Sequence, residues 1–133
     1  MLSTLMIWSA VWAKPAHADA LLQAVSFVLT GSDGQKVEVV DRKSCVFRLD
    51  ARTYYVNNII ADRITVQKWT RQRGDYIRVG LHGKAKVMEE TYAGTVSPVM
   101  DHELFVDPPD YDRVVRAWKY IYANGCKPAV TPF

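Results

Sequence analysis

Two cysteines constrain this chain more than any other feature, because a bond between them would join its middle to its end. Cys45 and Cys126 are the only cysteines among 133 residues. A chain exported to an oxidising compartment usually pairs its thiols. The bond would close a loop of roughly 80 residues, which stabilises the fold by about 4 to 5 kcal/mol through the entropy of the unfolded chain. Two free buried thiols are one alternative, and a single reactive cysteine is the other. The disulfide is favoured because neither cysteine has a local histidine or helix N-terminus to lower its pKa.

The first eighteen residues predict export, which is the premise for the disulfide. An apolar run precedes Lys14-Pro15 and consists of Leu2, Leu5, Met6, Ile7, Trp8, Ala10, Val11, Trp12 and Ala13. The next three residues, Ala16-His17-Ala18, have the small-x-small pattern that a signal peptidase accepts. We therefore expect residues 1–18 to be a signal peptide that is removed, so that the mature chain begins at Asp19.

Other interpretations of this N-terminal segment stay open. No basic residue precedes the apolar run, so a start codon upstream of Met1 is one of them. A transmembrane anchor is the main alternative, but the run from Leu2 to Ala13 is shorter than the ~20 residues that cross a bilayer. A buried N-terminal helix is another. Removing residues 1–18 takes away one charged residue, Lys14, so the formal charge falls from +3 to +2. Residues 19–133 then form one nearly neutral domain, long enough to bury a core.

Two segments of the mature chain predict helices. Leu21, Leu22, Val25, Val28 and Leu29 recur at helical spacing before Gly31, which predicts a helix over residues 19–30. Near the other end, Asp107-Pro108-Pro109-Asp110 is typical of a helix start, with an N-cap acceptor followed by proline. The apolar stripe that follows predicts the second helix and consists of Tyr111, Val114, Val115, Trp118, Ile121 and Tyr122.

The chain between the two helices has the period of two that is typical of strands. A first hairpin, turning at Ala51-Arg52, would place Cys45, Phe47 and Leu49 opposite Asn58, Val56 and Tyr54. A second, turning at Arg73-Gly74, would pair Val66 with Leu81 and Thr70 with Ile77 on a buried face. Its outer face would pair Trp69 with Arg78 and Arg71 with Tyr76, which permits cation–π contacts. Further strands are expected at residues 37–40, 85–89 and 92–98.

This order of elements predicts the fold class. Two helices bracket a run of antiparallel strands without regular βαβ alternation, which indicates an α+β fold. We expect a curved antiparallel sheet of about five to six strands, with the N-terminal and the C-terminal helix packed on it.

The second hairpin carries the strongest local excess of positive charge. A candidate surface for an anionic partner consists of Arg63, Lys68, Trp69, Arg71, Arg73, Tyr76 and Arg78. Basic and aromatic side chains on one face suit phosphate contact and base stacking, but export argues against nucleic acid. Lipid headgroups or an acidic glycan of the cell envelope then become the functional interpretation. The alternative is a solvated strand face whose basic residues protect a sheet edge from aggregation.

No motif of the mature chain predicts catalysis, a metal or a cofactor. Met100-Asp101-His102-Glu103 gathers three metal-ligating residue types, but neighbours in an extended segment point to opposite faces, so we expect a solvated loop and no metal site. Phosphate-loop and nucleophile-elbow motifs are absent from the sequence. If the protein is an enzyme, the residues to inspect are His82, Asp101, His102 and Glu103. A cleft that brings His82 within hydrogen-bond reach of a carboxylate would favour that interpretation.

The segments at residues 21–31, 39–42, 45–47 and 54–59 resemble small exported proteobacterial proteins of unknown function. This resemblance implies a location and carries no functional residues. We therefore expect a periplasmic or secreted domain that binds an envelope component or a protein partner without catalysis. The alternatives are a small hydrolase-like envelope enzyme with its site on the concave face of the sheet, and peripheral binding to an anionic membrane through residues 63–78.

Overall fold

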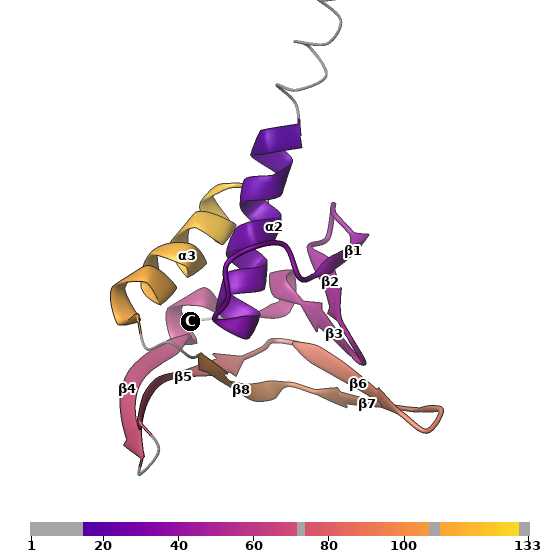
Figure 1. The fold of residues 1–133 in the computed structure, drawn as a ribbon. Coiled ribbons are helices and arrows are strands. Elements are labelled where there is room, and N and C mark those ends of the chain that lie inside the picture. Colours follow the sequence, from indigo (N-terminus) through magenta and orange to yellow (C-terminus); the bar gives the residue numbers. More distant parts are fainter. Residues whose placement is uncertain (1–14, 72–73, 107–109, 131–133) are drawn as a thin grey trace, which may run out of the picture.

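The computed structural model describes residues 15–71, 74–106 and 110–130. These form two α-helices, α2 (Pro15–Thr30) and α3 (Tyr111–Ala123). The strands are β1 (Glu38–Asp41), β2 (Val46–Leu49), β3 (Arg52–Tyr55), β4 (Thr65–Arg71), β5 (Gly74–His82), β6 (Met88–Tyr92), β7 (Thr95–Val99) and β8 (Asp101–Val106). Two short 3-10 turns, η1 (Val56–Asn58) and η2 (Ala61–Arg63), connect β3 to β4. Figure 1 shows the arrangement of these elements.

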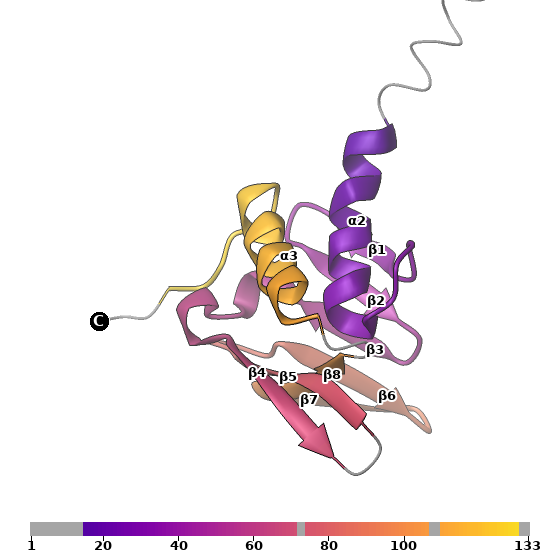
Figure 2. The ribbon, with the colours of Figure 1, turned by 60° about the vertical axis from the view of Figure 1, so that its left-hand side comes forward.

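The strands form two antiparallel sheets. One has the order β1-β2-β3-β6-β7 and the other the order β4-β5-β8. Both views place the two helices on the same side of the strands β4, β5 and β8 (Figures 1 and 2). The predicted α+β class, with a helix toward each end of the chain, is confirmed. We expected one curved sheet of about five to six strands, and the structure instead divides eight strands between two sheets.

The division between the sheets occurs at Gly83, directly after β5. The Gly83 N–H donates to the carbonyl of Met100, which separates β7 from β8. A Cβ atom at Gly83 would lie 2.3 Å from the carbonyl oxygen of Ala85 and 2.4 Å from a methyl carbon of Val87. Only glycine permits this close approach. The chain therefore turns here from the small sheet toward the large one.

Helix α2 is enclosed on more than one side, whereas the sequence predicts a single buried face. Its buried residues are Leu21, Leu22, Val25, Ser26, Phe27, Val28 and Leu29. Within the described residues the helix already extends from Pro15, four residues before the predicted start at Asp19. Most of the predicted signal peptide, residues 1–14, lies outside the described residues. Neither helix in the described ranges is both long and apolar enough to span a bilayer.

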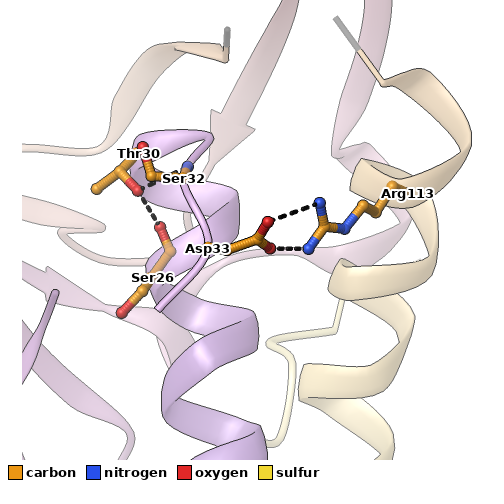
Figure 3. Close-up of polar contacts among 5 residues, drawn as sticks. All are labelled: Ser26, Thr30, Ser32, Asp33 and Arg113. Carbon is orange, nitrogen blue, oxygen red and sulfur yellow. Dashed lines mark hydrogen bonds and ion pairs between the residues drawn. The ribbon is translucent and has the colours of Figure 1, made fainter. Parts of the chain in front are cut away.

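A buried serine anchors the loop that follows α2. The hydroxyl oxygen of Ser26 accepts hydrogen bonds from the backbone N–H groups of Lys36 (2.8 Å) and Val37 (3.2 Å). Thr30 donates its hydroxyl to the carbonyl of Ser26, 2.7 Å away, and accepts from the N–H of Ser32 (Figure 3). These bonds satisfy polar groups at the end of the helix. They also fix where the chain enters β1.

Helix α3 begins later than its sequence predicts. Its N-cap is Asp110, which accepts from the backbone N–H of Arg113 at 3.1 Å. We expected the helix to start at Asp107, but a residue before proline disfavours helical geometry, and Pro108 precedes Pro109. Arg113 forms an ion pair with Asp33 of the loop after α2 (Figure 3). Its guanidinium carbon also lies 4.1 Å from the ring centre of Phe27, so one arginine joins both helices.

Both predicted hairpins form, each with a register two residues away from the expected one. In the first, the turn is Asp50-Ala51 and Phe47 pairs with Tyr54. Asp50 has a φ of 53°, a conformation that aspartate adopts more easily than most residues. In the second, Arg71 pairs with Gly74, and Val66 pairs with Val79 rather than with Leu81. A shift of two residues keeps the strand side chains on their predicted faces. Val56 and Asn58, which we expected to extend the first hairpin, lie instead in η1.

The disulfide predicted from the sequence is present in the structure. Cys45 and Cys126 are bonded, with 5.7 Å between their Cα atoms, and both are buried. Cys45 directly precedes β2, and Cys126 follows the end of α3. The bond therefore attaches the C-terminal helix to the large sheet, and it is typical of a protein in an oxidising environment.

The first prediction concerns this disulfide. Replacing both residues (Cys45→Ala with Cys126→Ala) should lower the free energy of unfolding by about 4 kcal/mol, because the unfolded chain regains the freedom of the loop. Urea denaturation followed by circular dichroism measures the difference. Dithiothreitol should destabilise the natural protein and leave the double variant unchanged. Two alkylatable thiols in the native, unreduced protein would contradict the pairing.

The second prediction concerns the turn between β6 and β7. Tyr92 pairs with Thr95 across a two-residue turn, Ala93-Gly94, and both turn residues have positive φ angles (51° and 81°). Alanine is strained there, whereas Asn-Gly is the preferred sequence for such a turn. Ala93→Asn should raise the free energy of unfolding by about 1 kcal/mol. The control is Ala51→Asn, in the two-residue turn between β2 and β3 but at a residue without a positive φ, and it should give no gain. Equal effects at both positions would contradict the explanation.

Candidate functional site

One face of the small sheet is left uncovered by the helices. On the covered side, Ile77, Val79 and Leu81 of β5 are completely buried. Alternate residues point the other way and form what we call the outer face. The outer face consists of Thr65, Gln67 and Trp69 of β4, Tyr76, Arg78, Gly80 and His82 of β5, and Asp101, Glu103 and Phe105 of β8. Three strands thus bring together residues from distant parts of the chain.

Three aromatic side chains form a row across the outer face. Trp69 pairs with Tyr76 on the neighbouring strand, and the ring of Tyr76 meets the ring of Phe105 edge to face, with centres 5.4 Å apart. Trp69 is 39% exposed and Phe105 is 53% exposed. The guanidinium of Arg78 lies 5.2 Å from the centre of the Trp69 ring, which confirms the predicted contact between them. Large aromatic surfaces exposed side by side are uncommon away from binding sites.

Beside the aromatic row, the charged residues occur in pairs. Arg78 forms an ion pair with Glu103 on β8. Hydrogen bonding between them raises the pKa of Arg78 and lowers the pKa of the Glu103 carboxyl, so both remain charged at neutral pH. The Nδ1 atom of His82 lies 2.8 Å from a carboxylate oxygen of Asp101. The outer face therefore offers donors and acceptors in fixed positions and little net charge among its described side chains.

These paired groups surround a hollow of about 550 Å³. Its lining includes Thr65, Arg78, Gly80, His82, Asp101 and Glu103. A Cβ atom at Gly80 would lie 2.5 Å from the hydroxyl oxygen of Thr65 and 3.9 Å from Nε2 of His82. Glycine thus permits the Thr65 hydroxyl to lie close to the β5 backbone, beside the His82 ring at the edge of the hollow.

The structure separates some residues of the predicted anionic-partner surface. Trp69, Tyr76 and Arg78 lie together on the outer face. Lys68 lies on the opposite face of β4, where its Nζ atom is 5.8 Å from the ring centre of Tyr111 in α3. The strand alternation that places Trp69 outward requires this position for Lys68.

The remaining residues of that predicted surface contribute less to the described geometry. Arg63 is exposed at the end of η2, before β4 begins. Arg73 and the side chain of Arg71 lie outside the described residues. Positive charge is therefore not concentrated on one described surface, although the aromatic part of the prediction is found on a single face.

The segment after Met100 is strand β8, and the expectation of a solvated loop there was wrong. Asp101 and Glu103 point to the outer face, whereas His102 points to the other side, with its ring centre 6.1 Å from that of Tyr54. Burial, reinforced by the charge of Arg52, lowers the pKa of His102. Its imidazole is therefore neutral at pH 7. The alternation was visible in Leu104 and Val106, which are buried on either side of exposed Phe105.

Four residues of the site were missed from the sequence: Thr65, Gln67, Gly80 and Phe105. Glycine and threonine in a strand carry no recognisable signal until the pairing of the strands is known. Phe105 could have been found through the alternation of β8. The pairing of β5 with both β4 and β8 is what brings these residues together with His82 and Asp101.

Comparison of the chain with protein-family models, with curated proteins and with solved structures gives no match.

Proposed function

We propose that the protein is a periplasmic or secreted binding domain without catalytic activity, and that its outer face binds a glycan of the cell envelope. The observation that carries the proposal is the row of Trp69, Tyr76 and Phe105, with Trp69 and Phe105 exposed, beside a polar hollow. Aromatic rings stack on the apolar C–H faces of sugar rings, and a site of this kind combines such surfaces with a few fixed polar groups.

The polar groups support a ligand rich in hydroxyls. A sugar hydroxyl both donates and accepts hydrogen bonds, so it matches paired groups such as Arg78 with Glu103 and His82 with Asp101. A purely anionic ligand would be repelled by the carboxylates of Asp101 and Glu103. We propose that Arg71 and Arg73, which follow Trp69 in the sequence, add attraction for an acidic sugar.

Export supports the choice of an envelope ligand. The proposed signal peptide at residues 1–18 would direct residues 19–133 out of the cytoplasm. The bond between Cys45 and Cys126 is consistent with an oxidising compartment. Glycans are abundant there, whereas nucleic acid is not expected.

The third prediction tests the aromatic row. Trp69→Ala and Phe105→Ala should each weaken cosedimentation with purified peptidoglycan sacculi by about tenfold, the effect of losing roughly 1.4 kcal/mol of binding free energy. The matched control is Tyr92→Ala, which removes an aromatic side chain that is 82% exposed on the large sheet. It should bind like the natural protein, and all three variants should keep its thermal unfolding temperature.

Two results would overturn the glycan proposal. If sacculi bind the natural protein and all variants equally, the outer face is not the glycan-binding site. Binding to vesicles containing phosphatidylglycerol, but not to sacculi, would instead favour peripheral attachment to an anionic membrane through residues 63–78. That attachment should weaken steeply as the salt concentration rises.

A second candidate function rests on the hydrogen bond between His82 and Asp101. A carboxylate that holds Nδ1 of an imidazole leaves Nε2 to act as a general base toward water. Here Nε2 borders the hollow over Gly80. This arrangement favours a small envelope hydrolase as the alternative to a binding domain, with bound water as the nucleophile.

The fourth prediction separates the two functions. If the protein is a binding domain, purified protein should not hydrolyse chromogenic esters or glycosides above the rate of the buffer. Turnover that falls at least a hundredfold in His82→Ala would support the hydrolase and overturn the binding proposal. His102→Gln is the matched control: His102 borders the hollow, but its imidazole lies on the other side of β8, toward Tyr54, so its loss should leave such turnover unchanged.

A further inference from the structure

A second cavity lies on the helix side of β4, away from the outer face. It has a volume of about 490 Å³ between α3, η2 and β4, and its lining includes Ile64, Val66, Tyr111, Val115, Trp118 and Lys119. Volumes of this size are typical of sites for small molecules. The lining is mostly apolar, and it contains no carboxylate among the described residues.

The cavity is open because β4 is an edge strand. The small sheet has the order β4-β5-β8, so no strand continues it beyond β4. Val66 of β4 and Val115 of α3 are consequently only half-buried. The result is an apolar channel between the helix and the last strand of the sheet.

One residue of the lining, Trp118, carries a buried hydrogen-bond donor. Trp118 is 5% exposed, and its indole N–H has no hydrogen-bond partner among the described residues. Its ring stacks on that of Tyr122, whose hydroxyl donates to the carbonyl of Val56 and is therefore already satisfied. A buried donor without an acceptor destabilises a protein, and a ligand acceptor that reached it would remove that cost. Neighbouring side chains must move for this contact, because the nitrogen has no accessible surface at present.

Positive charge flanks the cavity on two elements. Lys119 is exposed on α3 and belongs to the lining. Lys68, on β4, holds its Nζ atom 5.8 Å from the ring centre of Tyr111, which also lines the cavity. An ammonium group on each side complements a single anionic group at the mouth.

We propose that this cavity binds a fatty acid, with its aliphatic chain along Ile64, Val66 and Val115. Its carboxylate would pair with Lys119 and accept from the indole N–H of Trp118 once the covering side chains move. The apolar lining accounts for the chain, and the flanking ammonium groups account for the sign of the head group. This site is independent of the glycan site on the outer face.

The test is a titration of the purified protein with sodium laurate below its micelle concentration, followed by calorimetry and tryptophan fluorescence. Laurate should bind to one saturable site. Dodecyltrimethylammonium, which has the same chain and a positive head group, should bind at least tenfold more weakly, and butyrate should not bind. Equal binding of the cationic and anionic amphiphiles would overturn the proposal.

Two variants place the binding in this cavity. Val115→Trp fills the channel and should weaken laurate binding at least tenfold. Lys119→Glu alters only an exposed side chain, so its effect on laurate does not depend on repacking of the core, and it should also weaken binding at least tenfold. Lys84→Glu makes the same charge change at an exposed residue away from the cavity and should bind laurate normally. Trp69→Ala should also bind normally, which separates this site from the outer face.

Other occupants give different results. Laurate binding that survives both Val115→Trp and Lys119→Glu would overturn the proposal. Dimerisation in analytical ultracentrifugation that Val115→Trp abolishes, without laurate binding, would overturn it in favour of a second copy of the chain.

Discussion

Burial of α2 is the interaction on which the other elements depend. This helix exposes so little apolar surface because α3 covers it on one side and strands cover it on others. Val25 and Val28 contact no solvent, or almost none. Removing such side chains from water is the main favourable term in folding. Since α2 and α3 both lie on one side of β4, β5 and β8, the opposite face of those strands stays free, and the candidate glycan site exists for that reason.

The segment around η1 and η2 joins the C-terminal part of the chain to this core. Tyr122 of α3 donates to the carbonyl of Val56, and the backbone N–H of Lys127 donates to the side chain of Asn57. Ile60 forms a bridge with Ala129 a few residues later. Together with the disulfide, these contacts fix α3 beside the edge strand β4. The channel proposed for a fatty acid owes its position to this attachment.

The sequence predicted well those features that depend on local periodicity. Both helices follow from apolar spacing. The two hairpin registers were each wrong by two residues, but such a shift leaves the strand side chains on the predicted faces. The cysteine pairing followed from the predicted compartment. The bounds of α3 were less accurate, because the prolines before Asp110 were interpreted as the first helical turn.

Long-range pairing could not be predicted in the same way. His82 and Asp101 meet only because β5 pairs with β8, and the acidic and histidine residues that begin β8 concealed its strand character. Two sheets form where one was expected, and they divide at Gly83, whose close approach to Ala85 and Val87 no local sequence pattern predicts. The sequence therefore predicted part of the site, Trp69 and Arg78. The rest of the site depends on contacts between residues that are distant in the sequence.

The disulfide also determines how the chain would respond to mechanical tension between its ends. Cys45 and Cys126 are separated by 81 positions in the sequence. A force that pulls on the two termini is transmitted through the sulfur atoms, so the intervening residues cannot be drawn out. The residues between the two cysteines, which would span about 270 Å if fully stretched, therefore do not add to the extended length of the chain. Both candidate sites lie on residues inside that closed loop, which protects them from a pull that would unravel α2.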